Sequence, residues 1–241
     1  MSKSSGDGKN LIFIHGSGGN GAIWAYQSKY FSPHHNVFAI DLPGHGRNKE
    51  HFTTTVPEYA NYINSLIQEK CLALPIIVGH SLGGAIALRV ALDKPSTIGG
   101  LVLVGTGARL RVLPALFDLL RTDFDRALAM ISEYAFSPQT SSELVTKAMS
   151  EMRKGGPEVV YNDFAASDGF DVMSELSHVT APALIVVGRD DRLTPVKYSE
   201  YMNRNISGSE LAIIDGAGHM VMIEQPEAFN AALDSFLRTL K

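Results

Sequence analysis

Several features that mark specialised classes of protein are scarce or absent in this sequence of 241 residues. Its one cysteine, Cys71, has no partner for an intramolecular disulfide and lies in a helix-like stretch, so we expect a buried or half-buried thiol in a reducing compartment. The sequence contains no run of about 18 apolar residues, which is the length needed to span a membrane, and Met1 to Lys9 lacks the apolar segment of a signal peptide. We therefore expect a soluble cytoplasmic protein.

Charge of one sign is not concentrated anywhere along the chain. The net charge is -4 at pH 7, and acidic and basic residues are interspersed, so the chain has neither a cationic stripe for nucleic acid nor a polybasic segment for a membrane surface. His15 and His45 lack a second His, Cys or carboxylate at metal-ligand spacing, and we expect structural roles for both. Nucleic acid, membrane and metal are therefore not expected as partners, and no oligomeric state is indicated.

The chain does have enough apolar residues, 45%, to bury one sizeable core, which favours a single domain over residues 1–241. Six short apolar runs are strand-like, and the runs at 10–15 and 100–105 have the composition of buried central strands. Helix-like segments follow these runs, and this alternation predicts an α/β fold with a mainly parallel sheet flanked by helices. The predicted strands cover residues 10–15, 37–41, 75–78, 100–105, 183–188 and 210–215.

The alternation is interrupted once, between Ala108 and about Val179. This stretch has no strand-like run, only helix-like segments over 112–120, 125–136 and 141–153, with Gly155-Gly156-Pro157 as a break. The stretch leaves the sheet at the carboxyl end of the predicted strand 100–105, so residues 108–179 are predicted to form a helical cap at that edge. Most of its apolar side chains should form the core of the cap, while Leu116 and Met149 are candidates to line an acyl pocket.

The most informative motif is the Gly-x-Ser-x-Gly pattern of residues 79–83, which joins a predicted strand to a helix-like run. This arrangement is typical of a nucleophile elbow, in which the glycines allow a turn so tight that Ser81 is strained and projects from the sheet. A serine hydroxyl needs a base and an acid that orients the base. Asp190, Asp191 and His219 follow other predicted strands and can converge with Ser81 in one crevice.

Together these features resemble the α/β-hydrolase fold superfamily, and in particular its carboxylesterase-like serine hydrolases with a helical cap. Residues 15–19 resemble the family's oxyanion loop, 41–46 the turn after its next strand, 79–83 its elbow and 216–219 its histidine loop. The resemblance implies a sheet of about six strands with the cap inserted after the sixth family strand. The family usually begins with an antiparallel hairpin, and we expect this hairpin to be missing because only nine residues precede Asn10.

The resemblance also implies roles for individual residues. In chain order, Ser81, Asp191 and His219 match the nucleophile, the acid and the base, and the family's Gly-x-x-Asp turn favours Asp191 over Asp190. The implied donors to the oxyanion are the backbone N–H groups of Ser17 and Leu82. The candidate contacts to substrate are Gly16, Leu116, Met149 and Met220.

The implied reaction is hydrolysis of a small carboxylic ester with a short to medium acyl chain, through an acyl-enzyme and without a cofactor. A carbon–carbon bond hydrolase of ring-fission products is the alternative, although such enzymes commonly carry Asn and Trp where this chain has His80 and Met220. Lactonase and thioesterase activities use the same chemistry and stay open. A non-catalytic small-molecule receptor is a further alternative, which steady turnover of simple esters would exclude.

Overall fold

The computed structural model describes residues 8–51 and 53–240, which contain one six-stranded sheet in the order β2-β1-β3-β4-β5-β6. All neighbouring strands in this sheet are parallel. The predicted fold class is therefore confirmed. The predicted absence of an N-terminal hairpin concerns a region that includes residues 1–7, which lie outside the described part. The strands are β1 (Asn10–Ile14), β2 (Asn36–Ile40), β3 (Ile76–His80), β4 (Gly100–Val104), β5 (Ala183–Gly188) and β6 (Glu210–Ile214).

Alternate side chains of the central strands enter two separate hydrophobic cores. In β1, Ile12 and Ile14 belong to one core, and Leu11 and Phe13 belong to the other. All four are fully buried, which explains why this strand is a continuous apolar run rather than an alternating one. Each such side chain contributes about 1.5–3 kcal/mol by leaving water.

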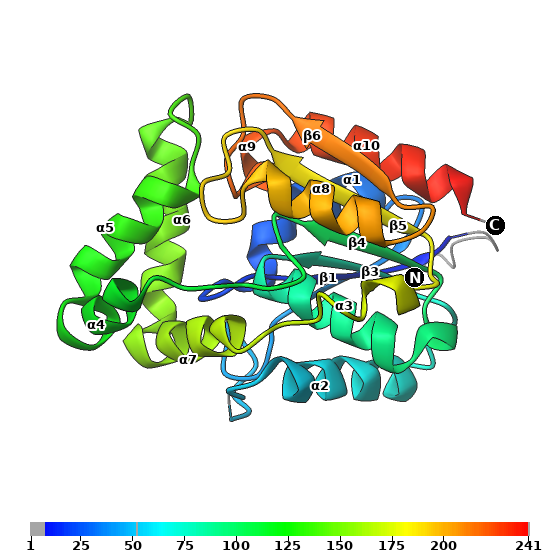
Figure 1. Ribbon diagram of the computed structural model, residues 1–241, viewed down its shortest axis with the longest axis horizontal. Coiled ribbons are helices and arrows are strands. Elements are labelled where there is room, and N and C mark those ends of the chain that lie inside the picture. Colours follow the sequence, from blue (N-terminus) through cyan, green and yellow to red (C-terminus); the bar gives the residue numbers. More distant parts are fainter. Residues whose placement is uncertain (1–7, 52, 241) are drawn as a thin grey trace.

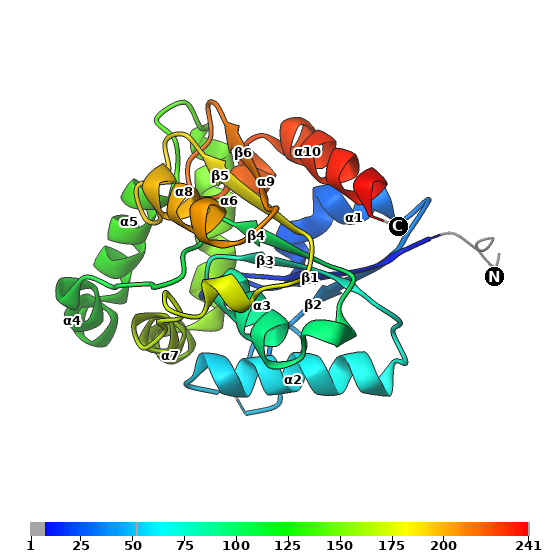
Figure 2. The same cartoon turned by 45° about the vertical axis from the view of Figure 1, so that its right-hand side comes forward.

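Helices cover both faces of the sheet (Figures 1 and 2). The helices on one face are α2 (Val56–Glu69), α3 (Leu82–Asp93) and α8 (Val196–Asn205); those on the other are α1 (Ala25–Phe31), α9 (Val221–Glu224) and α10 (Pro226–Thr239). A short 3-10 helix, Gly21–Trp24, directly precedes α1. No helix in the described part of the chain has the length and apolar character needed to cross a bilayer.

The expectation of a buried thiol was wrong. Cys71 is exposed because α2 ends at Glu69, and the chain then turns with Cys71 at a φ of 50°. This positive φ, uncommon for a residue with a side chain, takes Cys71 out of the helical face that would have covered it.

Between β4 and β5 the chain forms four α-helices, α4 (Pro114–Thr122), α5 (Phe124–Ala135), α6 (Ser142–Gly155) and α7 (Pro157–Asp168), which we call the helical insertion. A short 3-10 helix, Leu176–His178, follows them. Figure 1 shows them, in green, gathered at one end of the sheet. Leu116, Ile131 and Val160 form part of a small core of their own. The predicted break is present, since Gly156 has a φ of 84° between α6 and α7.

Candidate functional site

The turn between β3 and α3 can be made only with glycine at two positions. A Cβ atom on Gly79 would lie 2.1 Å from the carbonyl oxygen of Gly83, and one on Gly83 would lie 2.4 Å from the carbonyl oxygen of Ile14. Both distances are far below van der Waals contact. The turn places Ser81 at φ 53° and ψ -116°, a conformation that costs on the order of 1–3 kcal/mol.

The strained serine is held by hydrogen bonds to the neighbouring strand and to the loop after it. The Ser81 N–H donates to the carbonyl oxygen of Val104 at 2.9 Å, and the hydroxyl of Thr106 donates to the carbonyl oxygen of Ser81 at 2.8 Å. Since Thr106 is fully buried, the turn is fixed from both sides. The Ser81 side chain is thereby presented at the carboxyl edge of the sheet.

His219, in the loop after β6, lies beside the carboxylate of Asp191, in the loop after β5. The Nδ1 atom of His219 is 3.0 Å from Oδ2 of Asp191, and both side chains are almost completely buried. The Thr194 hydroxyl donates to the same Oδ2 at 2.8 Å, and Oδ1 accepts the N–H groups of Leu193 and Thr194 at 2.9 and 2.8 Å. The carboxylate is thus fixed by three donors besides the imidazole. No sequence motif indicated this role for Thr194.

The adjacent carboxylate has a different environment. Oδ2 of Asp190 accepts the hydroxyl of Ser137 at 2.6 Å, so this side chain is bonded to the helical insertion. The two aspartates that the sequence left as alternatives therefore differ in geometry, since it is Asp191 that contacts the imidazole of His219.

The histidine loop packs directly against the end of α5. The N–H of His219 donates to the carbonyl oxygen of Ala135 at 2.8 Å, and a Cβ on Gly218 would lie 2.7 Å from the backbone nitrogen of Ser137. The carboxylate of Glu224 accepts the N–H groups of Gly218 and Ser137, at 3.0 and 2.9 Å. The insertion is therefore hydrogen-bonded to the segment that carries His219.

The loop after β1 approaches the serine turn as closely as glycine permits. A Cβ on Gly16 would lie 3.0 Å from the Cβ of Ser81 and 2.8 Å from Nδ1 of His80. The N–H of Gly19 donates to the Gly16 carbonyl oxygen at 3.1 Å, which closes a tight turn in which Gly18 has a φ of 64°. Within the described residues the N–H of Ser17 has no hydrogen-bond acceptor.

Two buried histidines beneath these loops are held neutral. His15 donates from Nδ1 to the Gly16 carbonyl oxygen at 2.9 Å and accepts the Leu42 N–H on Nε2 at 3.1 Å. Burial, together with the nearby His45, lowers the pKa of His15 to about 4. Burial and then the neighbouring His219 also lower the pKa of His80, which donates from Nε2 to the His219 carbonyl oxygen at 3.0 Å.

A buried carboxylate on α7, Asp163, contacts the loop after β1 from the side of the helical insertion. Its Oδ2 accepts the N–H of Gly18 at 2.7 Å and lies 2.8 Å from Nε2 of His45, while its Oδ1 accepts the Tyr59 hydroxyl at 2.8 Å. Burial disfavours the charged form of His45, but the hydrogen bond to Asp163 and the charge of Asp163 outweigh it and raise the pKa of His45. Asp163 could not be predicted from the sequence, because its partners lie 104 to 145 residues away and no local motif marks it.

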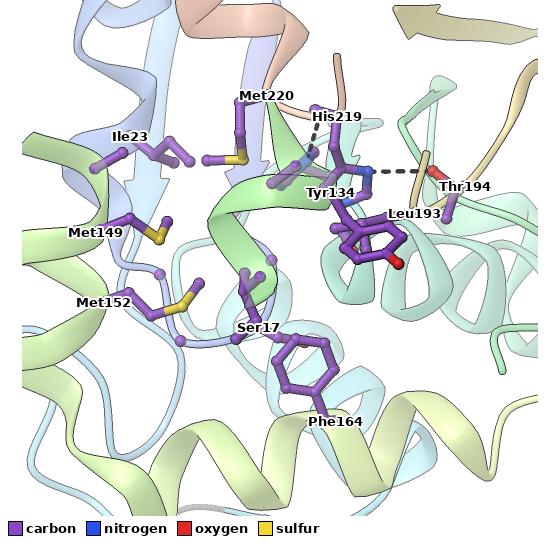
Figure 3. A pocket seen from close by; sticks show the side chains of 18 of the residues that line it. Ser17, Ile23, Tyr134, Met149, Met152, Phe164, Leu193, Thr194, His219 and Met220 are labelled. Carbon is purple, nitrogen blue, oxygen red and sulfur yellow. Dashed lines mark hydrogen bonds between the residues drawn. The ribbon is translucent and has the colours of Figure 1, made fainter. Parts of the chain in front are cut away.

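A cavity of about 920 Å³ lies between the sheet edge and the helical insertion, and both Ser81 and His219 line it. The Leu82 N–H, the first of helix α3, has no intrahelical acceptor. Figure 3 shows the side chains of Met149, Met152 and Met220 pointing into the same space beside Ile23. The sequence candidates that line this cavity are Gly16, Ser17, Leu116, Met149 and Met220; Leu82 is fully buried and is not among its lining residues.

Comparisons with known proteins cover nearly the whole chain. Residues 11–232 match the family model described as alpha/beta hydrolase family. The pimeloyl-[acyl-carrier protein] methyl ester esterase of Vibrio cholerae serotype O1 is 29% identical over 96% of this chain and 95% of that protein. Among solved structures, a thermophilic esterase is 35% identical, with a TM-score of 0.86 over 97% of this chain and 91% of that one. Est816, described as an N-acyl homoserine lactone degrading enzyme, is 27% identical, with a TM-score of 0.85 over 96% and 94%.

Proposed function

Since the chain belongs to the alpha/beta hydrolase family, we propose that it hydrolyses carboxylic esters with Ser81 as the nucleophile, His219 as the base and Asp191 as the acid that orients His219. One observation carries the proposal. The strained Ser81 lines the same cavity as His219, whose Nδ1 lies 3.0 Å from a carboxylate that is itself fixed by three other donors.

The roles follow from the hydrogen bonds around the imidazole. Asp191 accepts the proton on Nδ1 of His219, so Nε2 is left with a lone pair. As the Ser81 oxygen attacks the carbonyl carbon of the ester, Nε2 takes the hydroxyl proton, and the carboxylate of Asp191 stabilises the imidazolium. The imidazolium then protonates the leaving alcohol. Water, activated by the same Nε2, attacks the acyl-enzyme and releases the acid.

The negative charge on the carbonyl oxygen needs donors that are already oriented. The N–H of Leu82 begins helix α3, where the helix dipole also favours an anion, and the N–H of Ser17 has no acceptor within the described residues. These two groups are the proposed oxyanion hole. Each such donor contributes on the order of 10²- to 10³-fold to the rate of acyl transfer.

The side chains that line the cavity are expected to determine which acyl groups it accepts. Its volume of about 920 Å³ is near the upper end of the range for small-molecule sites, and methionine and leucine side chains line much of it. We propose that residues 108–179 act as a cap and that Leu116 and Met149 bear on the choice of acyl chain. We propose esters with short to medium acyl chains as substrates, and flexible methionine side chains can adapt to apolar groups of different shape.

Lactone hydrolysis is a second candidate. A lactone is a cyclic ester, so the same attack by Ser81 would open its ring, and one of the similar proteins, Est816, is described as degrading an N-acyl homoserine lactone. The similarity of 27% identity supports testing this substrate class alongside open-chain esters.

The test is a turnover panel of aryl esters of graded acyl length, an acyl homoserine lactone, an acyl thioester and a vinylogous diketone, run on the wild type, Ser81→Ala and His219→Ala. We expect ester turnover by the wild type and losses on the order of 10⁴-fold in each variant, far from additive when combined. A mass increase on Ser81 after treatment with a small phosphonate would identify the nucleophile. A tenth of the wild-type activity in Ser81→Ala, free of contaminating esterase, would refute the assignment.

A further inference from the structure

The helical insertion reaches the proposed oxyanion loop through one side chain. Asp163, on α7, is fully buried, and its Oδ2 accepts the N–H of Gly18 at 2.7 Å, next to the proposed donor Ser17. We infer that Asp163 is a positioning residue, which orients the Ser17–Gly18 peptide so that the Ser17 N–H is held toward the oxyanion. The inference rests on the proposed function, because it assigns a task within that reaction.

The conformation of the loop after β1 depends on the hydrogen bond from the Gly18 N–H to Asp163. The turn from Gly16 to Gly19 has its own hydrogen bond, at 3.1 Å, but the Gly18 N–H points away from the turn and is buried. Without Asp163 this N–H would lose its acceptor, at a cost of about 1–3 kcal/mol, unless the peptide rotated toward another partner. We expect such a rotation to displace the Ser17 N–H as well, because that N–H lies in the adjacent peptide plane, which is joined to the rotating plane at Cα of Ser17.

The insertion also packs on the same loop, which limits how the loop can respond. A Cβ on Gly18 would lie 2.8 Å from Cγ of Met152, on α6, and 2.9 Å from Cγ2 of Val160, on α7. The loop is therefore enclosed by α6 and α7, with Asp163 supplying the polar contact. The position of the insertion and the geometry of the oxyanion loop are linked through these contacts.

The carboxylate needs its charge for this task. Nδ1 of His45 is 2.9 Å from the carbonyl oxygen of Pro43, which can only accept, so Nδ1 carries a proton. For Nε2 of His45 to donate to Asp163 as well, the imidazole must be charged, and the two residues form a buried ion pair. Oδ2 then accepts both the Nε2 proton of His45 and the N–H of Gly18.

An amide at position 163 could not satisfy both neighbours. With the charge of Asp163 removed, a buried His45 would be neutral, and its Nε2 would present a lone pair. If the amide oxygen of the Asp163→Asn variant faced this lone pair, the two would repel each other; if the amide NH₂ faced it, the NH₂ would oppose the N–H of Gly18. Asp163→Asn should therefore disturb the oxyanion loop while changing the side-chain volume very little.

The chain offers two matched controls. Asp168→Asn is the same substitution on the same helix, at a carboxylate that accepts the N–H of Val112, at 2.9 Å, instead of Gly18. Tyr59→Phe removes the donor to Oδ1 of Asp163 and leaves the bond from Gly18 to Oδ2 in place. A purely structural role for Asp163 predicts that Asp163→Asn and Tyr59→Phe both lower stability without changing turnover per active site.

The experiment measures kcat and KM for an aryl ester, with active sites counted by phosphonylation of Ser81, and the affinity for a trifluoromethyl ketone that forms a tetrahedral adduct. For Asp163→Asn we expect kcat per titrated site to fall about 10- to 100-fold, KM to change less than about threefold, and the ketone affinity to fall in parallel with kcat/KM. For Asp168→Asn and Tyr59→Phe we expect kcat within about threefold of the wild type.

Wild-type kcat per titrated site in Asp163→Asn would overturn the inference, as would an equal loss in Asp168→Asn. If Asp163→Asn does not fold, the variant with both Asp163→Leu and His45→Leu takes its place, because apolar replacement of a buried ion pair is often tolerated. The same loss of kcat is expected there, and wild-type kcat overturns the inference. Full activity of Ser81→Ala would instead refute the proposed function, so the two failures are distinguishable.

Discussion

Replacing Asp191 by asparagine should disable His219 through a specific reversal of one hydrogen bond. Oδ1 of Asp191 accepts the N–H groups of Leu193 and Thr194, at 2.9 and 2.8 Å. These two donors would fix the amide of the variant with its oxygen in that position. The amide NH₂ would then take the place of Oδ2 and face Nδ1 of His219, which in the wild type lies 3.0 Å from Oδ2.

An NH₂ group facing Nδ1 would favour the tautomer of His219 that has its proton on Nε2. In that tautomer the imidazole cannot accept the proton of Ser81, and the imidazolium that forms in the reaction would lose its carboxylate. Loss of both effects in an otherwise intact site of this kind lowers kcat by about 10⁴-fold. This corresponds to about 5 kcal/mol of transition-state stabilisation.

The assay is steady-state hydrolysis of an aryl ester by Asp191→Asn and by its neighbour variant Asp190→Asn, after their unfolding midpoints are shown to match the wild type. Asp190 bonds to Ser137 of the helical insertion, and an amide oxygen can still accept that hydroxyl, so its loss of kcat should stay below about tenfold. Activity of Asp191→Asn within tenfold of the wild type, or a larger loss in Asp190→Asn, would refute the reasoning.

Three further predictions use the same protein. Gly79→Ala should prevent folding or lower the unfolding midpoint sharply, because its Cβ would lie 2.1 Å from a carbonyl oxygen, whereas Gly155→Ala, where the nearest atom is 3.9 Å away, should match the wild type in a thermal melt. The pKa of His15 is lowered to about 4, so about 3 kcal/mol of the free energy of unfolding, fully present above pH 6.5, is lost as the pH falls from 6.5 to 4. In urea unfolding, His15→Asn should lose that much less stability over this pH range than the wild type. The same dependence of stability on pH in both proteins would contradict the prediction. Leu116→Phe and Met149→Phe should each shift the acyl-length profile toward shorter esters, with phosphonylation of Ser81 unchanged, because both side chains line the cavity; an unaltered profile in both would move the specificity role to the loops after the strands.

The amino-acid sequence alone determined the fold class and the order of its elements. The central strands are buried on both faces and are therefore continuous apolar runs. All six predicted runs, including those of the half-buried edge strands β2 and β6, coincide with strands to within about two residues at either end. The glycines of the elbow could also be predicted, because the space they leave is set within a few residues, as the contact of Gly79 with Gly83 demonstrates. The apolar runs and the glycine spacing depend on residues that are close together in the chain, so they can be recognised from the sequence alone.

Local sequence patterns were insufficient where the position of one or two residues decides the surroundings of a side chain. The helix-like stretch around Cys71 suggested burial, but α2 ends before it and a positive φ turns the thiol to solvent. Asp190 and Asp191 are adjacent in sequence, and only the folded loop shows that one bonds to Ser137 and the other to His219. The choice between them depends on which side of a turn each carboxylate occupies.

Only the tertiary structure decided which polar groups are buried together. Asp163 meets Gly18, His45 and Tyr59 across separations of 104 to 145 residues, and each of these residues taken alone has an ordinary interpretation in the sequence. A buried carboxylate needs all its donors at once, and those donors come from a loop, a turn and a helix that meet only after the insertion has packed on the sheet. The sequence therefore determined where the proposed nucleophile Ser81 lies, whereas tertiary packing decided which side chains hold the groups around it.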